Sequence, residues 1–325
     1  MQNSNKISGM PIENTLTEKR AFPLLNFTGQ SQICEVYQKV EIRNIGVLLQ
    51  SRQGKNILSS PFYSAVLKEI KVICARENIN LVYSDLPVDE QGHTLACPEV
   101  SIERRLDSLL VIGMHLESEA SKSLDHLGVP VVLLDSSSEV KNYDAIEIAN
   151  YQGAYDAVSF LIKQGHKKIA IAGSSALTFP GIFDRRRGYI DALCDFDIKN
   201  QFFIDSPFNP VAAYRSALTF LKKENRVTAV FCVSDWIAMA VMRAARELGL
   251  VVNRDISLMG FNDILIASHM TPALTTMHVD LATMGRMSIN LIKNRIQYPG
   301  NRLIKVALRP NLVIRQSVQM LQGVQ

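Results

Sequence analysis

Aromatic, acidic, amide and guanidinium side chains gather just after several short apolar runs of the sequence. Phe62 and Tyr63 follow the first such run, at residues 45–50. The comparable residues after later runs are Arg185, Ser234, Asp235, Trp236, Asn262 and Asp263. Because open α/β sheets bind ligands at the carboxyl ends of their strands, we expect these side chains to face one ligand. Rings that stack on C–H faces, together with Asp, Asn and Arg as hydrogen-bonding groups, suit a polyhydroxylated molecule.

Each of these residues also has a purely structural interpretation. Asp235 follows Ser234 at an expected helix start, where a cap contributes about 1 kcal/mol. Asp263 can cap the turn that follows it, and Arg185 can lie on a solvated helix face. The aromatic residues can instead pack in the core, namely Phe62, Tyr63 and Trp236. The sequence leaves both interpretations open at every position.

Motifs that mark common enzymes are absent. No G-x-G-x-x-G follows an apolar run, and there is no G-x-x-x-x-G-K-[ST], G-x-S-x-G or H-E-x-x-H. The six histidines have no metal-ligand spacing; they are His93, His115, His126, His166, His269 and His278. The five cysteines form no C-x-x-C pair, which argues against a zinc site and favours a reducing cytosol. We therefore expect no catalysis, no metal and no cofactor.

The composition is that of a packed globular protein, with 47% hydrophobic and 20% charged residues. A net charge of +4 is too small to indicate a nucleic-acid-binding surface. The longest apolar runs, such as 129–134 and 227–233, have the length of strands, far below the roughly 20 residues of a membrane span. The N-terminal segment shows no apolar stretch of a secretory signal peptide. We expect a cytoplasmic protein without membrane contact.

Strand-like and helix-like segments alternate from Ile45 onward, which is typical of parallel βαβ units. Two successive sets of units predict an α/β protein with two doubly wound, Rossmann-like lobes. Strands are expected at 45–50, 80–85, 106–113, 129–135, 145–150, 167–173, 201–204, 227–234 and 256–263. Helices are expected from residue 61 and at 117–127, 151–164, 185–193, 210–223 and 235–248.

Several longer motifs resemble the effector-binding core of the LacI/GalR family of bacterial transcription regulators. They include SPFYSAVLKEI, ANYQGAYDAVSFLIKQGHKKIAIAG, RRRGYIDAL and GFNDILIASHMTPALTT, in the family's order. The resemblance covers residues from about 45 to 317. It implies a periplasmic-binding-protein-like fold of type I, whose two lobes are joined by three crossovers. A sugar or a similar small polar effector is then expected in the cleft between the lobes.

The resemblance also implies which residues bind the effector and how the chain is divided. The family's ligand positions fall on Phe62, Tyr63, Arg185, Phe208, Ser234, Asp235, Asn262 and Asp263. Ser at 234 and Asn at 262 depart from the family pattern, which leaves the effector's identity open. The implied segments are an arm at 1–43, a core at 44–317 and a tail at 318–325. Within the core, the first lobe takes 44–153 and 279–309, and the second takes 154–278 and 310–317.

The family further implies a homodimer formed through the first lobe. Operator DNA would be a partner only if residues 1–43 contain a headpiece, and they show no helix-turn-helix pattern. The acidic and basic residues of this arm cancel, so we expect no specific, high-affinity binding of duplex DNA by this chain. Two alternatives to a LacI/GalR regulator stay open. One is a sugar-binding protein of a transport or sensing system without DNA binding, and the other is an α/β enzyme with no recognisable motif.

Overall fold

The computed structural model describes residues 41–52, 55–89, 92–96, 106–138, 143–175, 180–223 and 227–321. The chain divides into one unit of residues 1–41 and a second of residues 42–325. The predicted arm at 1–43 lies almost wholly outside the described residues, as do residues 322–325 of the predicted tail. Both therefore stay predictions. None of the described helices is long and apolar enough to cross a membrane.

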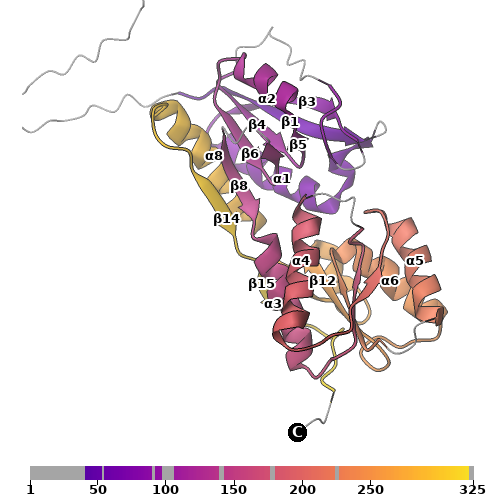
Figure 1. Cartoon of the computed structure of the whole chain (residues 1–325). Coiled ribbons are helices and arrows are strands. Elements are labelled where there is room, and N and C mark those ends of the chain that lie inside the picture. Colours follow the sequence, from indigo (N-terminus) through magenta and orange to yellow (C-terminus); the bar gives the residue numbers. More distant parts are fainter. Residues whose placement is uncertain are drawn as a thin grey trace, which may run out of the picture. The chain divides into compact units, whose positions relative to one another are not determined.

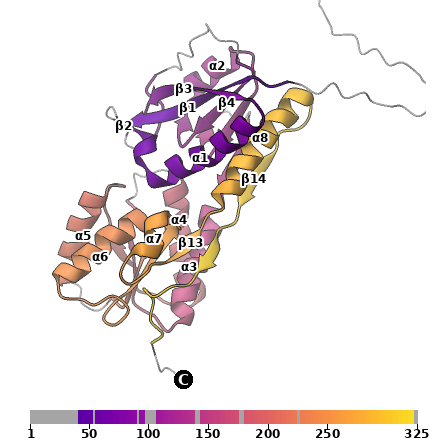
Figure 2. The same ribbon diagram turned by 180° about the vertical axis from the view of Figure 1, so that it is seen from behind.

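The first lobe is built on a sheet that, among the described residues, has seven strands in the order β14–β8–β6–β4–β1–β2, with β3 beside β1. The described pairs are parallel except that β2 runs antiparallel to β1. The strands are β1 Asn44–Arg52, β2 Lys55–Asn56, β3 Asn80–Pro87, β4 Ser108–Ile112, β6 Val131–Leu134, β8 Asp144–Ile148 and β14 Lys305–Leu308. Its helices are α1 Pro61–Arg76, α2 Ser118–Asp125 and α8 Leu281–Gln297, and Figure 2 shows α8 beside α1.

The second lobe, which holds α3 to α6 in Figure 1, is built on a six-stranded sheet, counted over the described residues. Its strand order is β10–β9–β11–β12–β13–β15. Its strands are β9 Ile169–Ala172, β10 Phe202–Ile204, β11 Ala229–Cys232, β12 Ser257–Asn262, β13 Thr275–His278 and β15 Asn311–Val313. Its helices are α3 Asn150–Lys163, α4 Pro180–Asp195, α5 Pro210–Lys223, α6 Asp235–Glu247 and α7 Leu265–His269. The predicted α/β class with two parallel-sheet lobes is confirmed.

The apolar strands are continuous because helices cover both faces of the sheets. In the first lobe, Leu110 of β4 packs in the cluster that holds Val66 of α1. Its neighbour Leu109 packs in the cluster that holds Leu124 of α2. Successive side chains point to opposite faces of a strand, so both faces need apolar residues. Helix α4 begins at Pro180, whereas the sequence predicts a start at residue 185. Proline suits the first turn of a helix, and the apolar period on which the prediction depends begins only after that turn.

The described chain passes between the two sheets three times. It leaves the first sheet after β8 and enters α3 of the second lobe, returns after β13 through α8 to β14, and leaves again to β15. Each lobe is therefore assembled from separate stretches of sequence. The element α8–β14 completes the first lobe only after five of the six described strands of the second lobe have been passed.

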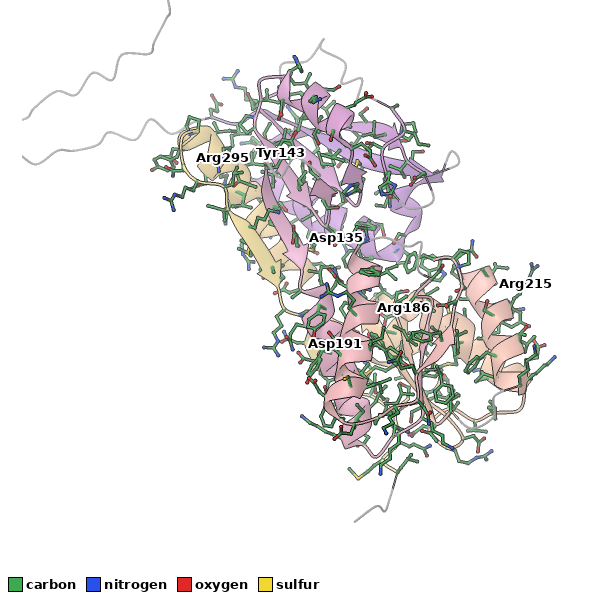
Figure 3. The ribbon with its side chains drawn as sticks, in the orientation of Figure 1. Asp135, Tyr143, Arg186, Asp191, Arg215 and Arg295 are labelled. Carbon is green, nitrogen blue, oxygen red and sulfur yellow. The ribbon has the colours of Figure 1, made fainter. Side chains whose placement is uncertain are left out.

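One buried arginine fastens this returning segment to the first lobe. Arg295 of α8 donates from Nε to Asp144 Oδ2 at 2.7 Å and from Nη2 to Asp144 Oδ1 at 2.9 Å. Its other bonds go to the backbone carbonyls of Pro299, Asn301 and Arg302. A guanidinium has five N–H groups, so all of them are used. The hydrogen bonds to Asp144 raise the pKa of Arg295. Figure 3 shows its place on α8.

Candidate functional site

Helix α4 carries the R-x-x-G-Y motif as Arg185, Gly188 and Tyr189. Gly188 lets α4 approach α3 closely, because a Cβ there would clash with Tyr151 O and lie 2.9 Å from Tyr155 N. The buried Tyr189 ties the helix to the sheet, since its hydroxyl donates to Ile169 O at 2.9 Å. These contacts hold α4 so that Arg185 reaches the end of β11.

Arg185 is only 6% exposed, yet its guanidinium is not fully used by the protein. Nε donates to Asn150 Oδ1 at 2.8 Å, Nη1 to Val233 O at 2.5 Å, and Nη2 to Asn262 Oδ1 at 3.4 Å. Because a guanidinium has five N–H groups, one on each terminal nitrogen makes no hydrogen bond to the described residues. Arg185 therefore has two N–H groups that no described residue accepts from.

The surroundings of Arg185 hold its charge in place. Burial lowers the pKa of Arg185 to about 10, opposed by the charges of Asp135, Tyr63 and Asp235. The guanidinium carbon lies 3.7 Å from the centre of the Phe261 ring, a cation–π contact. At neutral pH the guanidinium remains a cation, and it lies over the ring of Phe261.

Asp135 supplies the opposite charge from the first lobe, directly after β6, where Figure 3 labels it. The Tyr63 hydroxyl donates to Asp135 Oδ2 at 2.7 Å. Burial raises the pKa of Asp135, while the Tyr63 hydrogen bond and the charge of Arg185 lower it. Its other carboxylate oxygen, Oδ1, accepts no hydrogen bond from the described residues and so can accept one from a ligand hydroxyl.

Both carboxylate oxygens of Asp235, at the start of α6, accept hydrogen bonds from residues of the second lobe. Asp235 is 0% exposed. Its Oδ1 accepts from Thr276 Oγ1 at 2.5 Å and its Oδ2 from Ile264 N at 2.8 Å. Gly260 leaves the room for this carboxylate, because a Cβ there would clash with Asp235 Oδ1. Burial raises the pKa of Asp235 to about 7, and the two hydrogen bonds oppose that rise. Asp235 thus joins α6 to β13 and to the residue before α7.

The contacts of three further strand-end residues differ, namely those of Ser234, Asn262 and Asp263. Ser234 caps α6, since its hydroxyl accepts from Ile237 N at 3.3 Å. Asn262 meets Arg185 through Oδ1, and its φ of +104° turns the chain away from β12. Asp263 lies 2.7 Å from Arg315 and 3.0 Å from His278, so its carboxylate is already paired.

The aromatic residues also differ in their surroundings. Phe62 is buried in the core of the first lobe, as its structural interpretation has it. Its ring meets that of Tyr63 edge to face, with centroids 5.0 Å apart. Trp236 is partly buried, and Phe208 is 38% exposed between β10 and α5. Contact of these two rings with a ligand stays a prediction.

Comparisons with known proteins agree with the two-lobed α/β fold. A model of the periplasmic binding protein-like domain matches residues 158–318. A LacI family transcriptional regulator from Enterococcus faecium, solved with bound ribose, has a TM-score of 0.72 at 24% identity and covers 86% of this chain and 100% of its own. The lac repressor dimer bound to operator and an anti-inducer has a TM-score of 0.70 at 21% identity, over 85% and 94% of the two chains.

The sequence relative that decides the family is the HTH-type transcriptional repressor PurR of Edwardsiella ictaluri. It is 30% identical over 283 residues, which is 85% of this chain and 80% of the relative. The chain belongs to the LacI/GalR family. The prediction of a ligand-responsive regulator of LacI/GalR type is thereby confirmed.

Two residues of this LacI/GalR site were missed by the sequence prediction, namely Asp135 and Asn150. Both stand at the end of an expected strand, 129–135 and 145–150, which is the same signal that selected Asp263. The strand-end position therefore indicates Asp135 as well, but the sequence analysis assigns Asp135 to the strand itself. Its φ of +47° shows that the chain already turns at this point.

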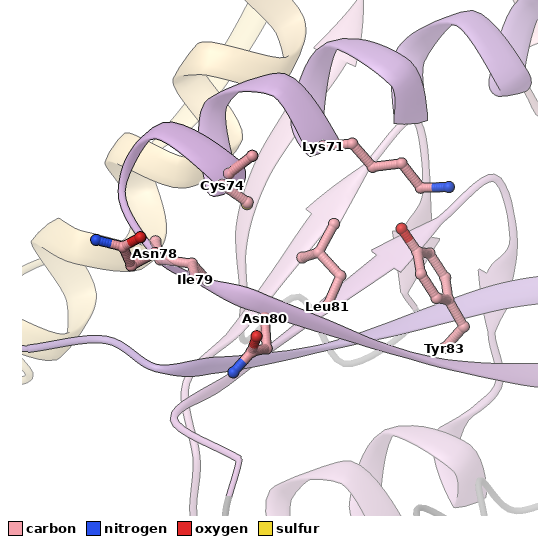
Figure 4. A pocket seen from close by; sticks show the side chains of 8 residues that line it. Lys71, Cys74, Asn78, Ile79, Asn80, Leu81 and Tyr83 are labelled. Carbon is pink, nitrogen blue, oxygen red and sulfur yellow. The ribbon is translucent and has the colours of Figure 1, made fainter.

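A surface recess of the first lobe lies apart from these residues. It has a volume of about 490 Å³ and lies between α1 and β3, as Figure 4 shows. Its lining includes Lys71, Cys74 and Tyr83. None of its lining residues contacts Arg185 or Asp135 in the described structure, so the recess is not part of the candidate effector site.

Proposed function

We propose that this LacI/GalR regulator binds a small, uncharged, polyhydroxylated effector between Asp135 and Arg185, and that a free sugar is the simplest such molecule. The observation that carries the proposal is the pair of unused N–H donors on the buried Arg185.

The chemistry of the two groups favours a neutral ligand with neighbouring hydroxyls. Two adjacent hydroxyl oxygens can accept from Nη1 and Nη2 of Arg185, in the parallel geometry that guanidinium forks prefer. A hydroxyl of the same ligand can donate to Oδ1 of Asp135. Because Asp135 and Arg185 already balance one another, an anionic ligand would add an uncompensated charge beside the carboxylate. The ribose in the Enterococcus faecium regulator supports a sugar-like ligand.

The arrangement also suggests how binding is converted into a signal. Asp135 and Tyr63 belong to the first lobe, whereas Arg185 and Asn262 belong to the second. A ligand that bonds to both groups binds one arrangement of the lobes more tightly than others, and it shifts the population toward that arrangement. We further propose that a homodimer transmits the change, as a dimer is the state of the lac repressor structure.

A melting screen tests the proposed effector class. The full chain is heated with pentoses, hexoses, their phosphates and nucleobases, one at a time. We expect a neutral sugar to raise the melting temperature, because a ligand at 100 times its Kd stabilises the folded state by about 2.7 kcal/mol. Stabilisation by sugar phosphates alone would overturn the neutral-ligand proposal.

Two follow-up measurements separate the regulator from its alternatives. Recovery of the ligand unchanged after long incubation is expected for a regulator, while its consumption would indicate an enzyme. Anisotropy titration against the promoter of its own gene, with and without ligand, tests DNA contact. We expect no saturable nanomolar binding by this chain, and such binding would show that residues 1–43 contain a DNA-reading element.

A further inference from the structure

A second group of ligating side chains lies in the first lobe, apart from the effector residues. His93, His115 and Glu117 each offer one ligand atom, and these atoms lie within 4.8 Å of one another. The histidines are distant in sequence and show no metal-ligand spacing, which is why the sequence predicted no metal. The fold brings them together where the segment 92–96 meets the residues that follow β4.

Backbone pairing fixes the two imidazoles side by side. His93 and His115 form an isolated parallel bridge. His115 N donates to Gly92 O at 2.9 Å, and Thr94 N donates to His115 O at 3.2 Å. The two rings meet edge to face with centroids 5.1 Å apart. Their relative position therefore does not depend on a flexible loop tip.

Polar neighbours orient both rings. His115 Nδ1 lies 2.7 Å from Ser137 Oγ, in the short strand β7 (Ser137–Ser138) that pairs with β5 (His115–Leu116). That bond turns the other ring nitrogen, Nε2, away from Ser137. His93 Nδ1 lies 3.1 Å from Asp89 Oδ2 and 4.0 Å from Glu117 Oε1. Histidine ligands of zinc are held by such outer partners, which fix the ring orientation and raise its basicity.

We propose that His93, His115 and Glu117 bind one divalent transition-metal ion of the Zn²⁺ class. Two imidazoles and one carboxylate, with a water as a fourth ligand, form an N/O donor set that zinc prefers. Bonds of about 2.0–2.2 Å place tetrahedral ligands roughly 3.4 Å apart. The three side chains are partly exposed, so they can close by that small amount. Mg²⁺ and Ca²⁺ prefer oxygen ligands and are not expected to bind.

Metal titration of the full chain tests this proposal. The protein is freed of metal with EDTA and titrated with Co²⁺, whose visible absorption reports the coordination, and Zn²⁺ then displaces the Co²⁺. We expect one Zn²⁺ per chain, and we expect His93→Gln and His115→Gln each to weaken binding at least 10-fold. Glu117→Gln is matched by Glu119→Gln, an exposed residue in the first turn of α2 that should have no effect.

Two further variants keep the result interpretable. Ser137→Ala removes the partner of His115 without removing a ligand, and we expect a loss of about 10–100-fold in affinity. His126→Gln, on the exposed end of α2, should bind Zn²⁺ as the parent does. Melting in EDTA checks that each variant folds. Unchanged Zn²⁺ affinity in the His93→Gln/His115→Gln double variant would overturn the proposal and leave His93 and Asp89 as an ordinary surface ion pair.

Discussion

Among the described residues, each lobe buries one arginine, and the two are used differently. Arg295 of the first lobe spends all five N–H groups on Asp144 and three backbone carbonyls. Arg185 of the second lobe spends three, on Asn150, Val233 and Asn262. A neighbouring carboxylate raises the pKa of Arg295, whereas burial lowers that of Arg185. The two arginines therefore differ in the number of N–H groups that the described residues leave unused, and not in burial alone.

The two strand-end carboxylates differ in the same way. Asp235 places both oxygens on donors of its own lobe, Thr276 and Ile264. Asp135 accepts from Tyr63 through one oxygen and keeps the other. We therefore expect Arg295 and Asp235, whose hydrogen-bonding groups are all used within their own lobes, to control stability. We expect Arg185 and Asp135, which keep unused groups, to control effector binding.

The largest expected effect is on stability, from Asp144→Ala. Removal of one partner leaves the buried Arg295 uncompensated, and such changes cost about 3–5 kcal/mol. Urea unfolding measures the loss. The control is Glu147→Ala on the same strand, whose carboxylate is exposed and lies 3.8 Å from Lys305. That surface pair should contribute less than about 1 kcal/mol. Equal losses in the two variants would contradict the structural role of Arg295.

The second effect is a pH dependence that comes from Asp235. Its folded pKa of about 7 lies above its unfolded value of 3.8. The folded state therefore holds a proton that the unfolded state loses, and stability falls as the pH rises from about 4 to about 7. The contribution is at most about 4 kcal/mol, from a shift of roughly three pKa units. Urea unfolding across this range should show a shallower decline for Asp235→Asn, and identical slopes would refute the assignment.

The third effect is on binding, from Arg185→Lys. Lysine keeps the charge but loses the planar fork, so affinity for the stabilising sugar should fall by about 1.5–3 kcal/mol. Calorimetry measures the loss. Arg187→Lys, two residues away and 57% exposed, is the matched control. Parent-like binding by both variants would show that the two unused donors do not meet the effector.

The smallest effect is expected from Tyr63→Phe. The variant loses one hydrogen bond to Asp135, which should weaken effector binding by about 1 kcal/mol. Because that bond lowers the pKa of Asp135, its loss should raise that pKa, so binding should weaken at a higher pH than in the parent as the solution is acidified. Titrations at pH 5.5 and 7.5 compare the two proteins. If the ratio of the two affinities is the same in both, Asp135 does not bind the effector as a carboxylate.

The strands and most helices could be predicted from the sequence because each apolar run is local. Residues 210–223, for example, are expected as a helix and form α5 with those same bounds. The predicted site includes Arg185 and Asn262, which the structure brings together. The sequence could not show that both carboxylate oxygens of Asp235 are used within its own lobe while Asp135 keeps one unused. The partners of Asp235, Thr276 and Ile264, lie on other elements. The pairing of His93 with His115 is hidden in the same way.

The threefold passage of the chain between the sheets has a consequence for synthesis. Asp144 and Arg295 are 151 residues apart, and five of the six described strands of the second sheet lie between them. At about 5–20 residues per second, Asp144 is synthesised roughly 8–30 s before Arg295. During that interval the nascent first lobe lacks α8 and β14, and one edge of its sheet is uncovered. The first five strands of the second lobe are synthesised before β14, and neither sheet is complete until the last segment, which carries β14 and then β15, has been made.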